Sequence, residues 1–367
     1  MRLLLAAQLA VAAWTFAAVP APRALLPATE VEPATAAPPQ ATAVCADGEV
    51  FGLVSHHECR ELLELRGRPA GEVAEGLSLD LGRTRRGAVR IVADGIAAPL
   101  DRGGGGDAAV ATWDELAEVV RRADKRKKKR KSGDGGCYAL WHGGEAAPWR
   151  VQSESANTGR VASLYARAEG PGAPTMLLDG FTMHRVAASD PSADTAAKLV
   201  AARPRGAVLD TCCGLGYTAC RSAEAPGVTA VCTIELDDVS IEMCRYSPYS
   251  AGLFRGPEDG HAPVTVLRGD AAARVAELPA GFFSTVIHDP PARALCKEGD
   301  LYGAAFYADL RRVATSGARL FHYIGAADSK ESGRLYAGVM ERLREAGWAG
   351  VKVDKEALGV VADAGSA

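Results

Sequence analysis

The second half of the chain, from Gly206 onward, alternates short apolar strands with helices. The strand-like segments read AVLDT, TAVCTIE, VTVLRGD, STVIHDP, ARLFHYIG and VKVDK, and the helical segments between them fall at 218–225, 237–246, 302–315 and 332–346. Apolar strands that alternate with helices are typical of a mostly parallel sheet covered on both faces. The sequence therefore predicts an α/β fold with a doubly wound, Rossmann-like sheet, to which a final hairpin through GVVADA adds an antiparallel edge strand.

Polar groups follow four of these predicted strands at the point where each strand ends. The first strand ends in Asp210, the second in Glu235 and the third in Asp270, and the fourth runs into His288-Asp289-Pro290-Pro291. In an open parallel sheet, ligands bind beyond the carboxyl ends of the strands, near the point where the strand order reverses. We therefore expect these groups to surround one ligand site.

The turn after the first strand, VLDTCCGLGYTA, fits two kinds of ligand. Gly214-x-Gly216-x-x-Ala219 matches a dinucleotide fingerprint, but the same turn suits S-adenosyl-L-methionine (SAM). Asp210 would repel the pyrophosphate of a dinucleotide, whereas it would attract the sulfonium and ammonium groups of SAM. The charge pattern therefore favours SAM over NAD.

Each remaining cofactor residue has a predicted role. Gly214 and Gly216 let the backbone approach the ligand closely, and Tyr217 covers it. Glu235 accepts hydrogen bonds from the ribose diol, a role that either ligand would allow, and Asp270 accepts from the adenine amino group. For each carboxylate alone, a helix cap or a solvated loop acid is the commoner reading. We predict no metal site.

The His-Asp-Pro-Pro stretch is typical of enzymes that modify amino groups. We expect an oxygen of Asp289 and a backbone carbonyl in the rigid Pro290-Pro291 turn to hold the acceptor nitrogen in line with the methyl group. Ala292 follows where an aromatic residue is usual, which disfavours a flipped planar base. The general base is expected to be His288, with His322 and His184 as alternatives; for each, a structural histidine is the competing interpretation.

Together these segments resemble a family of predicted SAM-dependent methyltransferases best known from archaea. The resemblance covers roughly residues 160–365 and rests on the ordered segments TMLLDGFTMHRV, LDTCCGLGYTA, TIELD, SPYSAGLF, GDA, IHDPP, DLYGAAFYADLRRV, GARLFHYIG and GVVA. It implies a class I methyltransferase fold, SAM contacts at Asp210, Gly214, Gly216, Glu235 and Asp270, and a substrate-side loop at Asp289, Pro290 and Pro291. Cys296 and Lys297 depart from the family pattern.

The chain divides into four predicted parts. Residues 1–44 form a targeting extension, 45–135 a small α+β region, 136–185 a strand-rich connecting region, and 186–367 the methyltransferase domain. The apolar stretch after Met1-Arg2, followed by a Pro/Ala-rich stretch, indicates a signal peptide and a transit peptide, and hence a plastid protein with no membrane segment in its mature form. The secretory pathway and the cytoplasm are the alternatives.

The first region has a basic run at 125–131, at the end of a helix opened by the Thr112-Trp113-Asp114-Glu115 capping box. Such a run either follows a phosphate backbone or is a solvated helix end. The formal net charge of the whole chain is only -3, and its nine cysteines lack regular spacing, so we expect reduced thiols.

The sequence thus predicts a SAM-dependent methyltransferase acting on a nitrogen, with RNA favoured as the acceptor. The first alternative is an aminopropyltransferase of the same fold. That enzyme needs an acidic pocket for a polycation, and the N-terminal half offers no acidic cluster. The second alternative is a non-catalytic RNA-binding protein, which would have no need of the strand-end carboxylates. The acceptor and the oligomeric state are not specified by the sequence.

Overall fold

The computed structural model describes residues 44–45, 48–99, 110–128, 135–141, 148–185, 189–255, 260–292, 296, 300–326 and 329–365. Two units are distinguished, residues 1–33 and 34–367, and every described residue belongs to the second. The targeting extension predicted at residues 1–44 lies outside the described residues apart from Val44, and so does the end of the basic run at 129–131.

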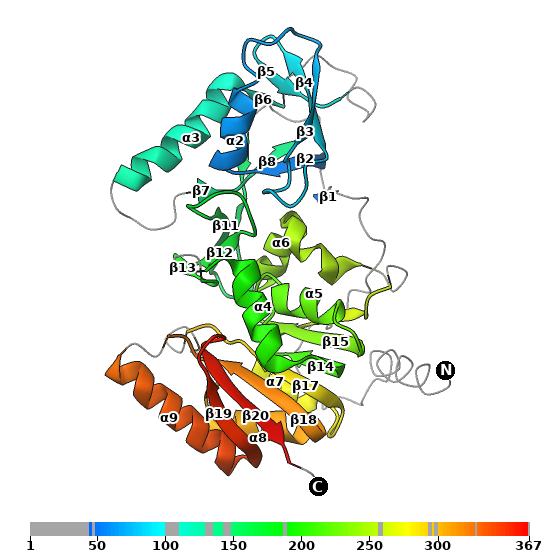
Figure 1. Ribbon diagram of the computed structural model, residues 1–367, viewed down its shortest axis with the longest axis vertical. Coiled ribbons are helices and arrows are strands. Elements are labelled where there is room, and N and C mark those ends of the chain that lie inside the picture. Colours follow the sequence, from blue (N-terminus) through cyan, green and yellow to red (C-terminus); the bar gives the residue numbers. More distant parts are fainter. Residues whose placement is uncertain are drawn as a thin grey trace. The chain divides into compact units, whose positions relative to one another are not determined.

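A seven-stranded sheet forms the centre of the C-terminal part (Figure 1). Its spatial order is β16–β15–β14–β17–β18–β20–β19. The bounds are β14 Gly206–Asp210, β15 Val228–Glu235, β16 Val264–Arg268, β17 Phe283–His288, β18 Ala314–Tyr323, β19 Trp348–Asp354 and β20 Gly359–Ala364. The strands β14 to β18 pair in parallel, and the order reverses between β14 and β17. The predicted doubly wound α/β sheet is confirmed.

The last hairpin differs from the prediction in one respect. The strand β20 is antiparallel to its neighbours, as expected, but it lies inside the sheet between β18 and β19. The edge is formed by β19. The apolar sequence of β20 explains this position, since five of its six residues are buried.

Helices cover both faces of the sheet (Figure 1). One core cluster joins Val208, Ile287 and Phe321 to the first three helices, and a second joins their sequence neighbours Leu209, Val286 and Leu320 to the last three. Burying each such side chain contributes roughly 1.5–3 kcal/mol. The helices are α4 Pro191–Ala202, α5 Tyr217–Ala223 and α6 Asp238–Tyr246 on one face, and α7 Ala271–Glu277, α8 Ala304–Val313 and α9 Lys330–Glu345 on the other; a 3-10 helix, η2, spans Pro248–Phe254.

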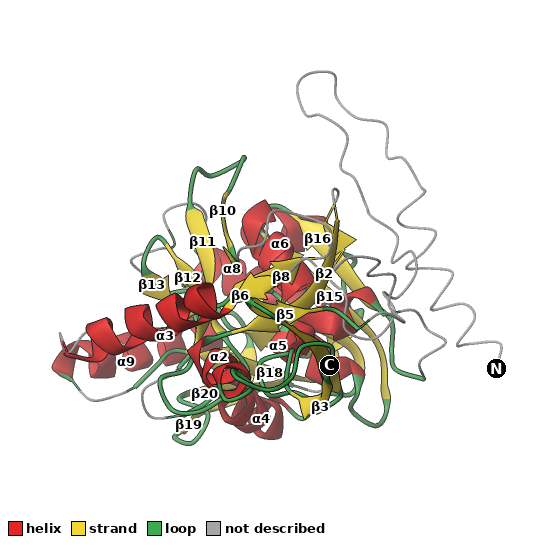
Figure 2. Ribbon diagram, turned by 90° about the horizontal axis from the view of Figure 1, so that it is seen from above, coloured by secondary structure: helices red, strands yellow, loops and turns green. Residues whose placement is uncertain are grey.

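Three smaller sheets precede the central one. Their orders are β1–β2–β8–β9, β3–β4–β5–β6 and β10–β11–β12–β13, and β7 pairs with β11. The strands are β1 Val44–Cys45, β2 Gly48–Val54, β3 Val73–Leu77, β4 Gly87–Val92, β5 Gly95–Ala97, β6 Ala111–Thr112, β7 Gly135–Gly136, β8 Tyr138–Trp141, β9 Trp149–Arg150, β10 Gln152–Glu154, β11 Val161–Ala166, β12 Thr175–Leu178 and β13 Phe181–Thr182; the helices are α2 His56–Leu63 and α3 Trp113–Lys128. Figure 2 shows the loop that joins β10 to β11.

In the small α+β region the segments LSLDLG (77–82) and AVRIVADGI (88–96) alternate like two strands, but neither is one continuous strand over those bounds. The first ends at Leu77, because Ser78 and Asp80 turn the chain: Gly82 N donates to Ser78 Oγ at 2.7 Å and Thr84 N donates to Asp80 Oδ1 at 2.9 Å. The second is the hairpin of β4 and β5, not one strand. The predicted capping box is confirmed, since Thr112 and Glu115 exchange hydrogen bonds at the start of α3.

The eight cysteines whose side chains the structure describes are all free. Within the described residues, no helix is both long enough and apolar enough to cross a bilayer, and no group of three or more His, Cys, Asp or Glu side chains could hold a metal ion.

Candidate active site

A cavity of about 1190 Å³ lies at the carboxyl ends of the central strands. The loops after β14, β15, β16 and β17 form one side of it, as the strand order requires. The other side comes from the chain that precedes the sheet, namely Arg160, Tyr165, the segment 176–185 and the helix α4. The strand-rich region therefore contributes directly to the walls of the candidate site.

The glycine turn and Glu235 are joined across this edge of the sheet. Gly214 N donates to Glu235 Oε2 at 2.8 Å, and Asp237 N donates to Glu235 Oε1 at 2.9 Å. Burial raises the pKa of Glu235 to about 7, although these backbone donors oppose the shift. Each carboxyl oxygen keeps a second lone pair, so Glu235 can still accept from a diol in the cavity.

The two glycines serve different purposes. Gly214 has φ +54°, and a Cβ there would meet no atom within 4 Å, so its bare backbone faces open space in the cavity wall. Gly216 has φ +70°, but a Cβ there would lie 2.4 Å from Leu253 Cδ1. Gly216 is not among the lining residues. The predicted close approach to a ligand therefore fits Gly214, whereas Gly216 is required by packing. Cys212, which stands in place of a first glycine, has no positive φ.

Tyr217 and Asp270 both line the cavity. The ring of Tyr217 lies 5.0 Å from that of His184, and its hydroxyl donates to Pro174 O at 2.9 Å, which fixes the ring as part of the wall. Asp270 is also the N-cap of α7, where it accepts from Ala273 N at 3.0 Å. The cap orients this carboxylate, so the helix-cap interpretation holds for Asp270, and its contact with an adenine amino group stays a prediction.

Asp210 does not line the cavity, contrary to our expectation that it faces the sulfonium group. It is fully buried below the turn and accepts hydrogen bonds from Thr233 Oγ1 at 2.7 Å and Thr218 Oγ1 at 3.3 Å. Burial raises the pKa of Asp210 to about 8. The two threonine hydroxyls give this carboxyl group partners inside the protein. Asp210 therefore ties the turn to β15 and α5.

The Asp-Pro-Pro turn does line the cavity, through Asp289, Pro290 and Pro291. Asp289 is held from α4, because Lys198 Nζ donates to Asp289 Oδ2 at 2.6 Å. The same ammonium group is 2.9 Å from Asp194 Oδ2 and 4.3 Å from the centre of the Tyr323 ring. Burial alone would lower the pKa of Lys198, but the charges of Asp289 and Asp194 outweigh it and hold that pKa above its ordinary value.

His288 lies outside the cavity, so its prediction as general base is wrong on geometric grounds. Its Nε2 is 2.9 Å from Leu301 O, and its Nδ1 is 2.7 Å from Thr211 Oγ1. A carbonyl only accepts, so Nε2 carries the proton and Nδ1 accepts from the threonine. Burial lowers the pKa of His288 to about 3. His288 is thus a structural histidine, because both ring nitrogens already have partners.

The other two histidines differ in position. His322 is fully buried behind Tyr307, whose hydroxyl lies 2.9 Å from His322 Nε2, and it does not line the cavity. His184 does line it, with Nδ1 3.2 Å from Thr175 Oγ1. Burial, reinforced by the Lys198 charge, lowers the pKa of His184 to about 3. His184 is therefore a wall residue and a weak base.

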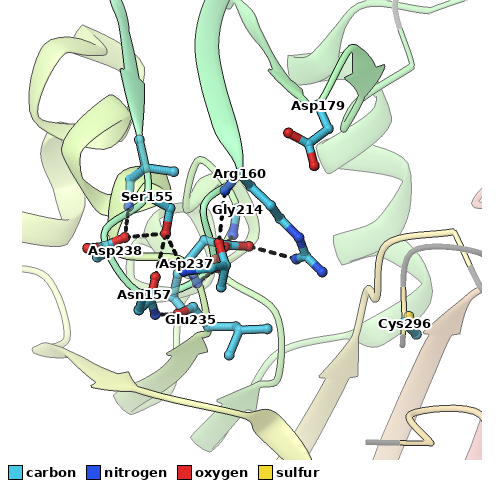
Figure 3. A network of polar contacts seen from close by, with 12 residues as sticks. Ser155, Asn157, Arg160, Asp179, Gly214, Glu235, Asp237, Asp238 and Cys296 are labelled. Carbon is cyan, nitrogen blue, oxygen red and sulfur yellow. Dashed lines mark hydrogen bonds and ion pairs between the residues drawn. The ribbon is translucent and has the colours of Figure 1, made fainter. Parts of the chain in front are cut away.

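Figure 3 shows a polar network between the β10–β11 loop and the loop after β15. Arg160 NH1 donates to Asp237 Oδ2 at 3.0 Å, and Asn157 Nδ2 donates to Leu236 O at 2.7 Å. Ser155 Oγ donates to Asp238 Oδ1 at 2.5 Å. Since Asp237 N in turn bonds Glu235, the loop from the strand-rich region fixes the position of the Glu235 carboxylate.

These residues fit SAM as a ligand. The open face at Gly214 leaves room for the ligand against the turn, and Glu235 and Asp270 provide acceptors for hydroxyl and amino donors. The lining carboxyl groups of Asp179, Asp194, Glu235, Asp237, Asp270 and Asp289 outnumber the three basic groups of Arg160, Arg185 and Lys198. An acidic cavity suits a cationic sulfonium ligand and disfavours a pyrophosphate.

The sequence analysis missed the side chains that come from the chain before the sheet. Lys198 and Asp194 are four residues apart on α4, and both are buried on the face that also carries Ala201 and Ala202. A lysine at an apolar position of a helix is an unusual feature that could have marked this pair. Arg160, by contrast, lies in a loop with no periodic signal that could have singled it out.

Three known proteins are similar in sequence to part of this chain. The chain is 41% identical over 196 residues to an uncharacterized protein of Methanocaldococcus jannaschii, in an alignment that covers 52% of this chain and 63% of that protein. It is 33% identical over 144 residues to polyamine aminopropyltransferase 2 of Streptomyces coelicolor, covering 39% of this chain and 26% of the relative. It is 32% identical over 77 residues to putrescine N-methyltransferase 1 of Nicotiana tabacum, covering 21% and 19%.

The chain thus spans less than two thirds of the length of each of these relatives. No family model matches it. Among solved structures, a spermidine synthase bound to a transition-state analogue aligns with a TM-score of 0.46 and 14% identity, over 59% of this chain and 73% of that one. The central sheet of this chain is of the Rossmann-like class I methyltransferase type.

Proposed function

We propose that this protein is a SAM-dependent methyltransferase that methylates a nitrogen atom. The observation that carries the proposal is that one cavity brings together Gly214, Glu235, Asp270 and Asp289, each from the end of a different central strand. The first three supply the cofactor side, and Asp289 supplies the acceptor side. The similarity to a putrescine N-methyltransferase supports transfer of a methyl group to nitrogen.

The residues of the chain act mainly by positioning. SAM, when bound, would supply an electrophilic methyl group. The N–C bond would form as the C–S bond breaks, the electron pair of that bond would go to sulfur, and the proton of the methylated nitrogen would then leave to water. Asp289 accepts an N–H of the acceptor with the oxygen that Lys198 leaves open, which aims the nitrogen lone pair. Pro290 and Pro291 keep the backbone beside Asp289 rigid.

Aminopropyl transfer is the second candidate, because polyamine aminopropyltransferase 2 is among the relatives and the cavity has more acidic than basic groups. The donor in that case is decarboxylated SAM. Our expectation that no acidic cluster exists concerned the N-terminal half, whereas these acids come mostly from the strand-end loops and α4. RNA as the acceptor and a plastid location stay predictions.

The test compares the two donors directly. The purified protein is titrated calorimetrically with S-adenosylhomocysteine, then incubated with extract fractions and either SAM or decarboxylated SAM. We expect heat with S-adenosylhomocysteine and products that gain one methyl group from SAM alone. Products that gain an aminopropyl group would establish the second candidate, and an absence of binding heat with S-adenosylhomocysteine would remove the methyltransferase.

A further inference from the structure

The positively charged group that lies beside Asp289 is the ammonium group of Lys198, a residue of this chain. Lys198 Nζ lies 2.6 Å from Asp289 Oδ2 and 2.9 Å from Asp194 Oδ2, and it sits over the Tyr323 ring. Its side chain is only 4% exposed, although it reaches the wall of the cavity. Two carboxylates and an aromatic face are the groups that bind an alkylammonium ion in a protein. Lys198 therefore fills an ammonium position next to the acceptor turn.

Apart from Asp194 and Asp289, few carboxylates of the cavity wall are open to pair with a charged amine. Asp237 is paired with Arg160, and Arg185 NH1 lies 3.2 Å from the other oxygen of Asp194. Glu235 and Asp270 lie on the predicted cofactor side, and Asp179 is exposed at the rim. A second ammonium group at Asp289 would also be repelled by the Lys198 ammonium at short range.

We propose that Lys198 determines acceptor specificity: it occupies the ammonium position between Asp194 and Asp289, so the acceptor nitrogen enters this cavity uncharged. This inference rests on the proposed function and narrows its substrate class. An aromatic amine, or another amine that is uncharged at neutral pH, fits the open oxygen of Asp289. Aliphatic diamines, including the putrescine in the name of one relative, do not.

The neutral acceptor also simplifies the chemistry that the chain must perform. An alkylammonium ion has no lone pair and must lose a proton before it can attack a methyl group. A neutral amine keeps its lone pair, so the chain needs no strong base before transfer, and the methylated nitrogen loses its proton to water afterwards. This agrees with the cavity, where His184 is the one lining histidine among the described residues and is a weak base.

The test uses 1,4-diaminobutane as the probe, titrated into the full-length protein saturated with S-adenosylhomocysteine. Wild-type protein is expected to give no heat up to millimolar diamine. Lys198→Met keeps the length of the side chain but removes its charge, so Asp194 and Asp289 are left to pair with the probe, and the affinity should rise at least about tenfold. Lys198→Arg, which keeps the charge, and the exposed Lys330→Met should, like the wild-type protein, give no heat with the diamine.

Two results would overturn the role of Lys198. One is diamine binding or diamine methylation by the wild-type protein that is lost in Asp289→Asn. The other is a Lys198→Met protein that binds S-adenosylhomocysteine normally but gains no diamine affinity. If that variant does not fold, Lys198→Gln and the wild-type titration decide. Different outcomes test the proposed function. It fails if S-adenosylhomocysteine gives no heat, and it stands if the wild-type protein methylates the diamine, although the role of Lys198 would then be wrong.

Discussion

The guanidinium group of Arg160 lies 3.0 Å from Asp237 Oδ2 and thereby connects the strand-rich region to the cofactor side of the cavity (Figure 3). The side chains are 20% and 4% exposed, so the pair is largely shielded from water. Asp237 N holds Glu235 Oε1. Arg160 is therefore a positioning residue that acts on Glu235 through Asp237.

Replacing Arg160 by Gln should weaken S-adenosylhomocysteine binding, because Asp237 loses its charged partner and the Glu235 carboxyl group loses its fixed orientation. We expect Kd to rise about 3–10-fold, because the lost charge-assisted hydrogen bond acts on the ligand indirectly, through Asp237 and Glu235. Calorimetry measures this change. The matched control is Arg205→Gln, which removes an exposed arginine whose NH2 group donates to Gly317 O. Equal affinities in both variants would contradict the connection.

Replacing Asp289 by Asn should abolish most turnover and leave cofactor binding nearly intact. The amide keeps the shape of the carboxylate, but it weakens both the hold of Lys198 and the alignment of the acceptor. We expect the methyl-transfer rate to fall by about 10²–10³-fold. Radiolabelled methyl transfer and S-adenosylhomocysteine titration test the two halves of this statement. Asp309→Asn, at an ion pair on α8, should change neither quantity. A normal rate would show that the acceptor binds elsewhere.

Replacing His288 by Gln should affect stability and not the pH profile of activity. The variant disturbs two buried hydrogen bonds, to Leu301 O and to Thr211 Oγ1, at a cost of about 1–3 kcal/mol in the free energy of unfolding. The pKa of His288 is lowered to about 3 by burial, so the ring is uncharged at neutral pH. Denaturant unfolding and the pH dependence of the rate are the two measurements. If the pH dependence of the rate lost an ionisation in the variant, His288 would be the general base.

Cofactor affinity should rise with pH through the titration of Glu235, whose pKa is raised to about 7 by burial. Above that value the group is a carboxylate, which accepts hydroxyl donors from a ribose more strongly than the protonated acid does. Between about pH 6 and pH 8 we expect affinity to increase about 3–10-fold in the wild-type protein. In Glu235→Gln the affinity should be lower and independent of pH over this range, apart from titration of the ligand. Parallel pH curves for the two proteins would exclude Glu235 as the titrating group.

The raised pKa of Glu235 makes folding stability depend on pH in the opposite direction to cofactor affinity. A carboxyl group whose pKa rises on folding, from 4.5 to about 7 for Glu235, holds its proton more tightly in the folded state. Its contribution to stability is therefore most favourable at low pH and falls as pH rises through that window. Stability and cofactor affinity thus depend on pH in opposite directions.

Replacing Gly216 by Ala should destabilise the protein more than the same change at Gly281. Both residues have positive φ, +70° and +62°, so both variants carry backbone strain of about 1 kcal/mol. At Gly216 the new Cβ would also lie 2.4 Å from Leu253 Cδ1, which adds about 1–3 kcal/mol of overpacking, whereas the space at Gly281 is open. Thermal or denaturant unfolding of the pair checks the difference. Equal losses would mean that Leu253 moves aside without cost.

The sheet, and the edge of it at which the site forms, could be predicted from the amino-acid sequence alone. Strand and helix periodicity are local properties, and parallel strands bring their carboxyl ends to one edge, so Glu235, Asp270 and Asp289 could be placed together without a structure. The capping box at Thr112 was equally local. The signal and transit peptides of residues 1–44 remain predictions, because that extension lies almost wholly outside the described residues.

Which strand-end groups face the cavity, and which residues hold them, became clear from the three-dimensional packing alone. Asp210 and Glu235 both end strands, yet Asp210 turns to Thr218 and Thr233 below the surface while Glu235 lines the cavity. Arg160 and Lys198 reach their partners across 77 and 91 residues of chain. Such contacts depend on how elements pack in space, and the periodicity of a sequence, which reports only neighbours along the chain, does not contain that information.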